Sequence, residues 1–393
     1  MEKIREKKKI ILLTLAGLGL YLLTTGISYA TFSYLKVPGP LIVSPLPSGE
    51  SKFRVDLSAP KTEECPLNGQ KYTKAEKDIW SKRRPLSVMI ENHQDSRPQS
   101  GVSRADIVYE AVSEGGITRF LAIFYCGVSA FDVQIGPVRS ARTYFLDFAS
   151  EYGDFPLYAH VGGANTPGRA NALGQIGDYG WLKKGNDLNQ FSIGFPTFWR
   201  DYERLDHPVA TEHTMYSTSD KLFIVAEKRN LTNVDEASVP WDKNFLKWQF
   251  KEDSKEGERG TKSPTFSFWK GYSDYDVKWE YDQTANDYKR INGGLAQKDR
   301  NDESEIRGKV VVLAFMKESR ANDGYEGNLH LLYGTKGSGK VLIFQDGQVL
   351  EGTWNKKDRK ERMVFKDTKG KEIKLNRGQI WIEILPTGSE VSY

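Results

Sequence analysis

Cysteine is nearly absent from this sequence, since Cys65 and Cys126 are the only two among 393 residues. Two cysteines so far apart lack the close paired spacing of a zinc-binding module. In an oxidising compartment they can form one disulfide bond. The sequence leaves this pairing open against the alternative of two separate small apolar side chains.

The chain also has little net charge, because 56 Lys and Arg against 52 Asp and Glu leave only +4. The first nine residues, "MEKIREKKK", supply five basic minus two acidic charges, or +3 of that sum. The remainder is close to neutral, whereas a nucleic-acid-binding surface needs clustered positive charge. We therefore expect no nucleic-acid partner.

The stretch "GTKGSGKV" at 334–341 lacks a residue that an ATP-binding loop requires. Its glycines and Lys340 have the phosphate-binding spacing, but the next residue is Val341, where Ser or Thr would hold Mg²⁺. The residues that follow are β-branched and apolar around Asp346 and Gly347, which predicts a hairpin with the glycines in a loop before it. We predict that the chain binds no ATP.

Long apolar runs are absent except at residues 10–35, which contain no charge. About 20 such residues are enough to cross a bilayer. The basic tail at 1–9 precedes the run, so the positive-inside rule places this tail in the cytoplasm. A cleaved signal peptide is the alternative, because "SYA" at 28–30 offers small residues for cleavage. We predict a retained single-pass anchor in the cell membrane, since the apolar run continues past Ala30; both alternatives export the rest.

Composition divides the exported part into four regions. Residues 36–79 begin rich in Pro, Ser and Gly and are interpreted as a stalk and lead-in. A charged stretch at 251–264 has almost no apolar side chains, which indicates a linker, assigned to 231–264. We therefore expect one domain at 80–230 and a second at 265–393.

Strand and helix patterns are mixed in the first of these domains. Residues 86–92 resemble a strand, and 105–112 with 117–126 resemble a hairpin. Apolar residues then recur every three or four positions through 141–152, which predicts an amphipathic helix with Ser140 as its N-cap.

The second domain is mainly strands, as in "KVVVLAFM" at 309–316 and the alternating "QIWIEIL" at 379–385. We predict a small sandwich or a partly open barrel there. The overall fold class is therefore α+β: an amino-terminal membrane helix, a mixed α/β first domain and a mainly-β second domain.

Arginines concentrate in the first domain beside a predicted helix start. Arg139 and Arg142 in "GPVRSAR" flank that start, and we expect them to converge with Arg119. Guanidiniums beside free helix N–H groups favour negative charge, so the three residues are our candidate anion-binding site. The alternative is that they form structural ion pairs with nearby carboxylates, namely Glu114, Asp147 and Glu151.

Two histidines are candidates for moving protons. His160 ends a strand-like segment and precedes Gly162 and Gly163, which suits a general base with backbone donors beside it. His213 is the second candidate; a structural, hydrogen-bonded role is the alternative for either. A metal site would group His93 with these two, but no close ligand spacing is present, so we predict no metal and no cofactor.

Long phrases of the sequence resemble a known family. "PLSVMIENHQDSRPQSGVSRADIVYEAVSEGGITRF" and "IGPVRSARTYFLDFASEYGDFPLYAHVGG" are similar to the YerB-like family, a domain of unknown function, over about 80–230. "YDQTANDYKR", "GSGKVLIFQDGQVLEGTW" and "KLNRGQIWIEIL" resemble the carboxy-terminal β domain of that family. The resemblance implies a two-domain envelope protein, often a lipoprotein, without an assigned reaction.

This chain departs from the family pattern in two places. No lipobox cysteine follows the apolar run, so anchoring would be by the helix itself. After "RING", where relatives tend to carry Pro-His and Asp, this chain has "GLAQKDRND", which argues against a ligand role for a histidine there.

Two functions from different classes follow. The first is a membrane-anchored extracytoplasmic binding or scaffold protein that acts on cell-wall polymers or the enzymes that make them. The second is an extracytoplasmic hydrolase or transferase for an anionic envelope substrate, with the three arginines holding charge and His160 or His213 moving protons. We favour binding because no nucleophile, base and orienting group can be named together, and Ser140 lacks the G-x-S-x-G setting of a nucleophile.

Overall fold

The computed structural model describes residues 8–9, 15–20, 23–24 and 55–393. The chain divides into two units, Met1–Lys52 and Phe53–Tyr393. Most of the predicted tail and anchor, and residues 36–54 of the stalk and lead-in, lie outside the described residues. In the part that is described, no helix combines the length and the apolar character needed to cross a membrane.

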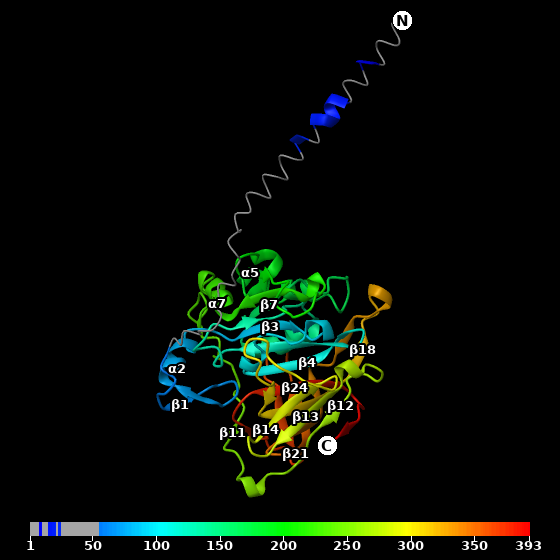
Figure 1. The fold of residues 1–393 in the computed structure, drawn as a ribbon. Helices are drawn as coiled ribbons and strands as arrows, with labels where there is room; N and C mark the ends of the chain where they lie inside the picture. The colour runs from blue at the N-terminus through cyan, green and yellow to red at the C-terminus, as the bar shows by residue number, and fades with distance from the viewer. Residues whose placement is uncertain (1–7, 10–14, 21–22, 25–54) are drawn as a thin grey trace. The chain divides into compact units, whose positions relative to one another are not determined.

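One large mixed sheet organises the second unit (Figure 1). Its ten strands, in spatial order, are β22 (Val364–Asp367), β21 (Gln348–Lys356), β20 (Gly337–Gln345), β17 (Val310–Met316), β24 (Ile380–Pro386), β4 (Ile107–Glu114), β5 (Ile117–Phe124), β3 (Leu86–Glu91), β7 (Leu157–His160) and β8 (Asp187–Asn189). The central strands are buried on both faces, which explains their continuous apolar runs.

The two predicted domains share this sheet. β24, from the carboxy-terminal part, pairs in parallel with β4 of the amino-terminal part, with Ile380 opposite Ile107. On its other side β24 pairs in parallel with β17. Short-range periodicity predicts each strand but not this pairing, because a parallel pair joins residues far apart in the chain.

A second sheet packs against the first. It contains β15 (Leu295–Ala296), β14 (Asp287–Asn292), β13 (Val277–Asp282), β12 (Thr265–Phe266) and β25 (Val391–Ser392), with β16 (Arg307–Gly308) paired to β14. Trp279 of β13 lies 5.1 Å from Trp381 of β24 between ring centroids, so the aromatic core joins the two sheets.

The remaining elements are short. Within residues 55–393 the α-helices are α2 (Lys74–Trp80), α3 (Thr143–Ala149), α4 (Ala172–Asp178), α5 (Trp181–Lys184), α6 (Gln190–Ile193) and α7 (Ser219–Lys228). The small sheets are β1 (Lys61–Glu64) with β2 (Lys71–Thr73); β6 (Gln134–Ile135), β10 (Met215–Thr218) and β9 (Trp199–Arg200); β11 (Phe250–Lys251) with β23 (Leu375–Asn376); and β18 (Glu318–Arg320) with β19 (Leu331–Tyr333).

The predicted hairpin in the ATP-like stretch is confirmed. β20 and β21 pair in antiparallel register on either side of Asp346 and Gly347. The strand begins at Gly337, so Gly337 and Gly339 belong to it, whereas Gly334 lies in the loop before it. Gly339 is needed there, because a Cβ would lie 2.6 Å from both the Phe315 carbonyl oxygen and the Trp354 indole nitrogen.

The predicted N-cap Ser140 is wrong. The helix begins at Thr143 and its N-cap is Arg142, whose φ of −136° and ψ of 148° are extended. The chain stays extended up to this point because the Ala141 N–H donates to the Gly162 carbonyl, forming a bridge to the segment after β7.

The open question of the cysteines has an answer in this structure. Cys65 and Cys126 form a disulfide bond with Cα atoms 6.0 Å apart. It ties the segment before β3 to the end of β5.

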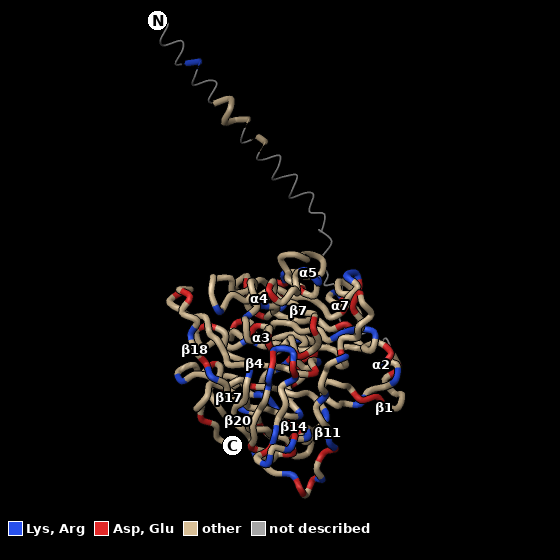
Figure 2. Tube along the Cα trace, turned by 180° about the vertical axis from the view of Figure 1, so that it is seen from behind, with Lys and Arg blue, Asp and Glu red and all other residues tan. Residues whose placement is uncertain are grey.

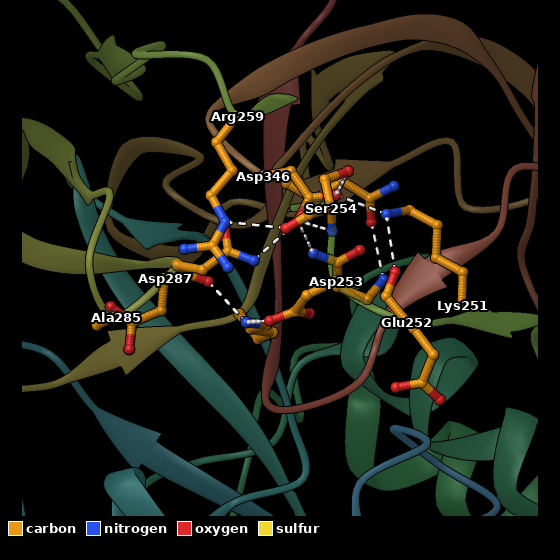
Figure 3. A network of polar contacts seen from close by, with 12 residues as sticks. Lys251, Glu252, Asp253, Ser254, Arg259, Ala285, Asp287 and Asp346 are labelled. Carbon is orange, nitrogen blue, oxygen red and sulfur yellow. Dashed lines mark hydrogen bonds and ion pairs between the residues drawn. The ribbon is translucent and has the colours of Figure 1, made fainter. Parts of the chain in front are cut away.

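The charged stretch interpreted as a linker is held by side-chain bonds (Figure 3). The buried Asp346 carboxylate accepts from Lys251 Nζ at 2.5 Å and from Ser254 Oγ at 2.9 Å. Burial by itself raises the pKa of Asp346, but the bonds from Lys251 and its neighbours hold it below its ordinary value. The charged stretch is therefore bonded to Asp346 of the hairpin turn, although its composition resembles that of a free linker.

Candidate functional site

A pocket of about 390 Å³ is lined mainly by charged side chains, and we call it the charged pocket. Around the molecule as a whole, basic and acidic residues are interspersed along the chain (Figure 2). The lining residues come from both predicted domains: Glu91, His93, Glu114, Ile117, Arg119, Arg139, Ser140, Arg142, Glu212, His213, Tyr325 and Glu326.

Glu114 organises one half of the charged pocket. It ends β4, and the turn to β5 brings Arg119 beside it, with Arg119 Nη2 donating to Glu114 Oε2 at 3.0 Å. Arg142 donates from Nε to the other carboxylate oxygen. Burial alone would raise the pKa of Glu114, but Arg119 and Arg142 more than offset it and hold the pKa at about 2.

Arg119 is itself nearly buried, with 8% of its side chain exposed. Its Nη1 donates to the Ser140 carbonyl at 3.2 Å, while Nε has no hydrogen-bond partner among the described residues. Burial and the neighbouring Arg142 charge lower its pKa to about 10. The guanidinium remains charged at neutral pH, so the pocket keeps a fixed positive group.

Glu91 organises the other half. It ends β3, and its two carboxylate oxygens accept from Arg139 Nε at 2.9 Å and from His213 Nδ1 at 2.7 Å. The bond to Glu91 raises the pKa of His213 against the opposing effect of burial. His93 stacks on His213 with ring centroids 4.8 Å apart and planes 19° apart.

The second predicted domain supplies one wall. Tyr325 and Glu326 lie in the short 3-10 helix Tyr325–Gly327, in a loop between β18 and β19. The Tyr325 ring stacks on His330 at 4.2 Å, and His330 Nδ1 lies 2.7 Å from Asp323 Oδ2. This loop brings carboxy-terminal residues to a pocket otherwise built on β3, β4 and β5.

The structure brings Arg119, Arg139 and Arg142 together in one pocket with His213. Each guanidinium also pairs with a protein carboxylate, which is Glu114 or Glu91. Two carboxylates named as alternative partners bond elsewhere: Asp147 accepts from Tyr179 and Thr335, and Glu151 pairs with Lys356. The anion-binding role of the three arginines stays a prediction.

His160 lies apart from these residues and does not line the charged pocket. It is fully buried, its Nε2 is 2.6 Å from Asp187 Oδ1, and its Nδ1 is 2.6 Å from the Gly162 carbonyl oxygen. Both ring nitrogens are therefore used by the protein, as in the structural alternative considered for this residue.

Sequence reasoning missed Glu91 and Glu212 and gave His93 only a rejected metal role. Glu91 and His213 are 122 positions apart, so no local spacing connects them. One available signal was the place of Glu91 at the end of a strong strand pattern, where polar side chains often form sites.

Comparisons with known proteins match both parts of the described unit. The family model of the N-terminal domain of a protein of unknown function (DUF3048) matches residues 69–232, and that of its C-terminal domain matches 266–382. A relative from Bacillus subtilis (strain 168), named "Putative lipoprotein YerB", is 29% identical over 351 residues, covering 87% of this chain and 88% of the relative.

A solved structure agrees. The crystal structure of YerB protein from Bacillus subtilis matches with a TM-score of 0.65 and 26% identity, covering 84% of this chain and 100% of that chain. The resemblance drawn from the sequence phrases is thus confirmed. The chain belongs to the YerB-like family, and its matches to the N-terminal and C-terminal domains of that family follow one another along the sequence.

Proposed function

We propose that this chain is an extracytoplasmic binding protein of the cell envelope whose ligand site is the charged pocket. Its apolar run at 10–35 would hold it at the membrane, with the unit Phe53–Tyr393 outside. The lipoprotein name of its Bacillus subtilis relative supports a place at the envelope. The disulfide between Cys65 and Cys126 supports an oxidising compartment.

The observation that carries this proposal is the mixture of charges around an open pocket. Three arginines and four glutamates line it, and the arginines converge from different elements. Because Glu91 and Glu114 already neutralise much of the positive charge, a simple anion would meet carboxylates as well as guanidiniums. A ligand carrying both carboxylate and amino groups, as the peptides of cell-wall polymers do, fits this lining better.

A second candidate is the hydrolase or transferase, and one observation favours it. His213 lies in the same pocket as the arginines, and Glu91 fixes its Nδ1, which is the arrangement of a base with an orienting group. Ser140 also lines the pocket, but within the described residues no hydrogen bond joins its hydroxyl to His213. Binding therefore has the stronger support.

A binding assay on matched variants tests the proposal. The full chain, in detergent, would be titrated with soluble cell-wall peptide fragments by calorimetry. Arg139→Ala should weaken binding at least about ten-fold, since one charged hydrogen bond in a pocket contributes about 1.5–3 kcal/mol. Arg300→Ala is the control, because Arg300 is also 25% exposed and paired to a carboxylate, Asp206.

Equal binding by wild type and Arg139→Ala, or equal losses in both variants, would count against the charged pocket as the ligand site. Mass spectrometry of the same mixtures separates the two candidate functions. New cleavage or transfer products that disappear with His213→Gln would establish the second candidate in place of simple binding.

A further inference from the structure

We propose that His93, Asp95 and His213 bind a divalent metal ion at the charged pocket, a site that goes beyond the ligand binding proposed above. One ligand atom from each of these three side chains lies within 4.8 Å of the other two. His93 and His213 line the pocket, and Asp95 follows on the turn after β3. No local spacing predicts the group, because His213 comes from a distant 3-10 helix, Thr211–His213.

The hydrogen bonds leave His213 ready to coordinate. Its Nδ1 lies 2.7 Å from Glu91 Oε2, so this nitrogen carries the proton and Nε2 keeps its lone pair when the ring is neutral. A carboxylate behind a histidine fixes the ring and increases the basicity of the opposite nitrogen, as is usual for metal-bound histidines. His213 is only 5% exposed, so its position is set by packing.

His93 presents the lone pair of Nδ1 as its ligand atom, and this lone pair now accepts a backbone hydrogen bond that metal coordination would replace. Its Nδ1 accepts from the Asp95 backbone N–H at 3.2 Å and must therefore be unprotonated. The same nitrogen lies 3.6 Å from Asp95 Oδ2. The His93 ring stacks on His213 with ring centroids 4.8 Å apart, so the two imidazoles lie side by side at the pocket.

The spacing needs only local adjustment. Nitrogen and oxygen ligands lie about 2.0–2.2 Å from Zn²⁺, which puts two ligand atoms roughly 3.3 Å apart. The present limit of 4.8 Å leaves at most about 1.5 Å to close. Asp95 is exposed and His93 half-buried, so both side chains can rotate toward the fixed His213.

The donor set indicates the class of ion. Two imidazole nitrogens and one carboxylate suit Zn²⁺ and neighbouring first-row ions, whereas Mg²⁺ and Ca²⁺ prefer oxygen ligands. Near the site, the negative charges of Glu91 and Glu212 offset the positive charge of Arg139. Three protein ligands leave a coordination position for water or a pocket ligand.

Direct metal binding tests this proposal. The full chain, in detergent, would be stripped with a chelator and titrated with Zn²⁺, followed by zinc content after gel filtration and by the melting temperature. Wild type should retain one Zn²⁺ per chain and melt at a higher temperature with zinc. His93→Ala and Asp95→Ala should each bind at least about ten-fold more weakly, since even outer-shell changes cost about 10- to 100-fold.

His207→Ala is the matched control. His207 is exposed and its Nε2 lies 3.0 Å from the Asp95 carbonyl oxygen, so it borders the same turn without belonging to the proposed ligands. Its variant should bind zinc as wild type does. The exposed position of Asp95 keeps the test valid even if a variant at the buried His213 fails to fold. Wild-type affinity in both His93→Ala and Asp95→Ala, or a loss confined to His207→Ala, would overturn the site.

Discussion

Two clusters of arginine and glutamate each include one glutamate of strand β4, and the clusters differ in what surrounds them. Glu110 belongs to a closed cluster, in which Arg290 donates to Glu110 at 2.5 Å and to Glu383 at 2.8 Å. All three side chains are 0% exposed. Aromatic rings at 4.7–5.6 Å surround the guanidinium, namely Phe120, Trp279 and Trp381.

Four positions along β4, Glu114 belongs to the charged pocket, where it pairs with Arg119 and Arg142. These pairs are also within hydrogen-bonding distance, but one side of them faces an open pocket. Pairing alone therefore does not separate a structural arginine from one that meets a ligand. What separates them is whether protein atoms cover every face of the guanidinium.

The closed cluster also explains how the two family domains stay together. Glu110 lies in the first family domain and Arg290 in the second, and Glu383 lies on β24, directly after the end of the second match at residue 382. Separation of the two domains would break the pairing of β24 with β4 and expose the buried rings of Phe120, Trp279 and Trp381, which is costly because a large apolar surface would meet water.

The largest expected effect is at Arg290. Arg290→Ala leaves the Glu110 and Glu383 carboxylates buried without their cation, and both lie within reach of that one guanidinium. We expect the free energy of unfolding to fall by about 3–5 kcal/mol, as when one partner of a buried pair is removed. Denaturant unfolding followed by tryptophan fluorescence measures this.

Arg300→Ala is the control for the loss of a partly exposed pair, and it should cost no more than about 1 kcal/mol. A loss below about 1 kcal/mol for Arg290→Ala as well would mean that closure does not distinguish the two kinds of cluster.

The next effect is at Glu114 and depends on pH. Its pKa falls from 4.5 to about 2 in the folded protein, which corresponds to about 3 kcal/mol of stability. Because the folded pKa is lowered, this contribution is present above pH 4.5 and is lost as the pH falls toward 2. Glu114→Gln should therefore be about 3 kcal/mol less stable than wild type at pH 7.

Unfolding measured at several pH values checks the sign. The difference between wild type and Glu114→Gln should shrink as the pH falls from about 5 to 2. A difference that stays constant over this range would show that the lost stability comes from packing rather than from the charge of Glu114.

Local patterns in the sequence predicted the parts that depend on neighbours along the chain. The hairpin around Asp346 follows from the β-branched and apolar pattern of a few neighbouring residues. The sequence also predicted that Arg119, Arg139 and Arg142 converge, because they lie close together in the chain beside a predicted strand and helix start.

The parts that failed depend on distant partners. Ser140 was an acceptable N-cap by type, but a bridge from Ala141 to Gly163 keeps the chain extended past it. The pairing of Glu91 with His213 and of Arg290 with Glu110 joins residues 122 and 180 positions apart. Such contacts are set by the sheet order, which periodicity does not reveal.

A smaller effect on stability is expected at Arg139. A single pair to Glu91 with 25% of the arginine side chain exposed should contribute no more than about 1 kcal/mol. The nearby charge of Arg139 lowers the pKa of His213, so Arg139→Ala should raise that pKa further. NMR titration of the histidine signals measures the change, and Arg300→Ala should leave the His213 signal as in wild type.

The smallest effect is expected at Lys340, which supplies the baseline for the comparison. It is exposed on β20, and no carboxylate pairs with it in the described part of the chain; its ammonium lies 5.9 Å from the centroid of the Phe315 ring. Lys340→Ala should change the free energy of unfolding by no more than about 0.5 kcal/mol. ATP should leave the melting temperature of both proteins unchanged, because Gly337 and Gly339 are strand residues and Lys340 is followed by more of the same strand rather than by a helix that could face a phosphate. A rise in melting temperature with ATP that Lys340→Ala abolishes would contradict the hairpin interpretation. If Lys340→Ala lowered the free energy of unfolding as much as Arg290→Ala, burial could not be the cause of the difference between the two clusters.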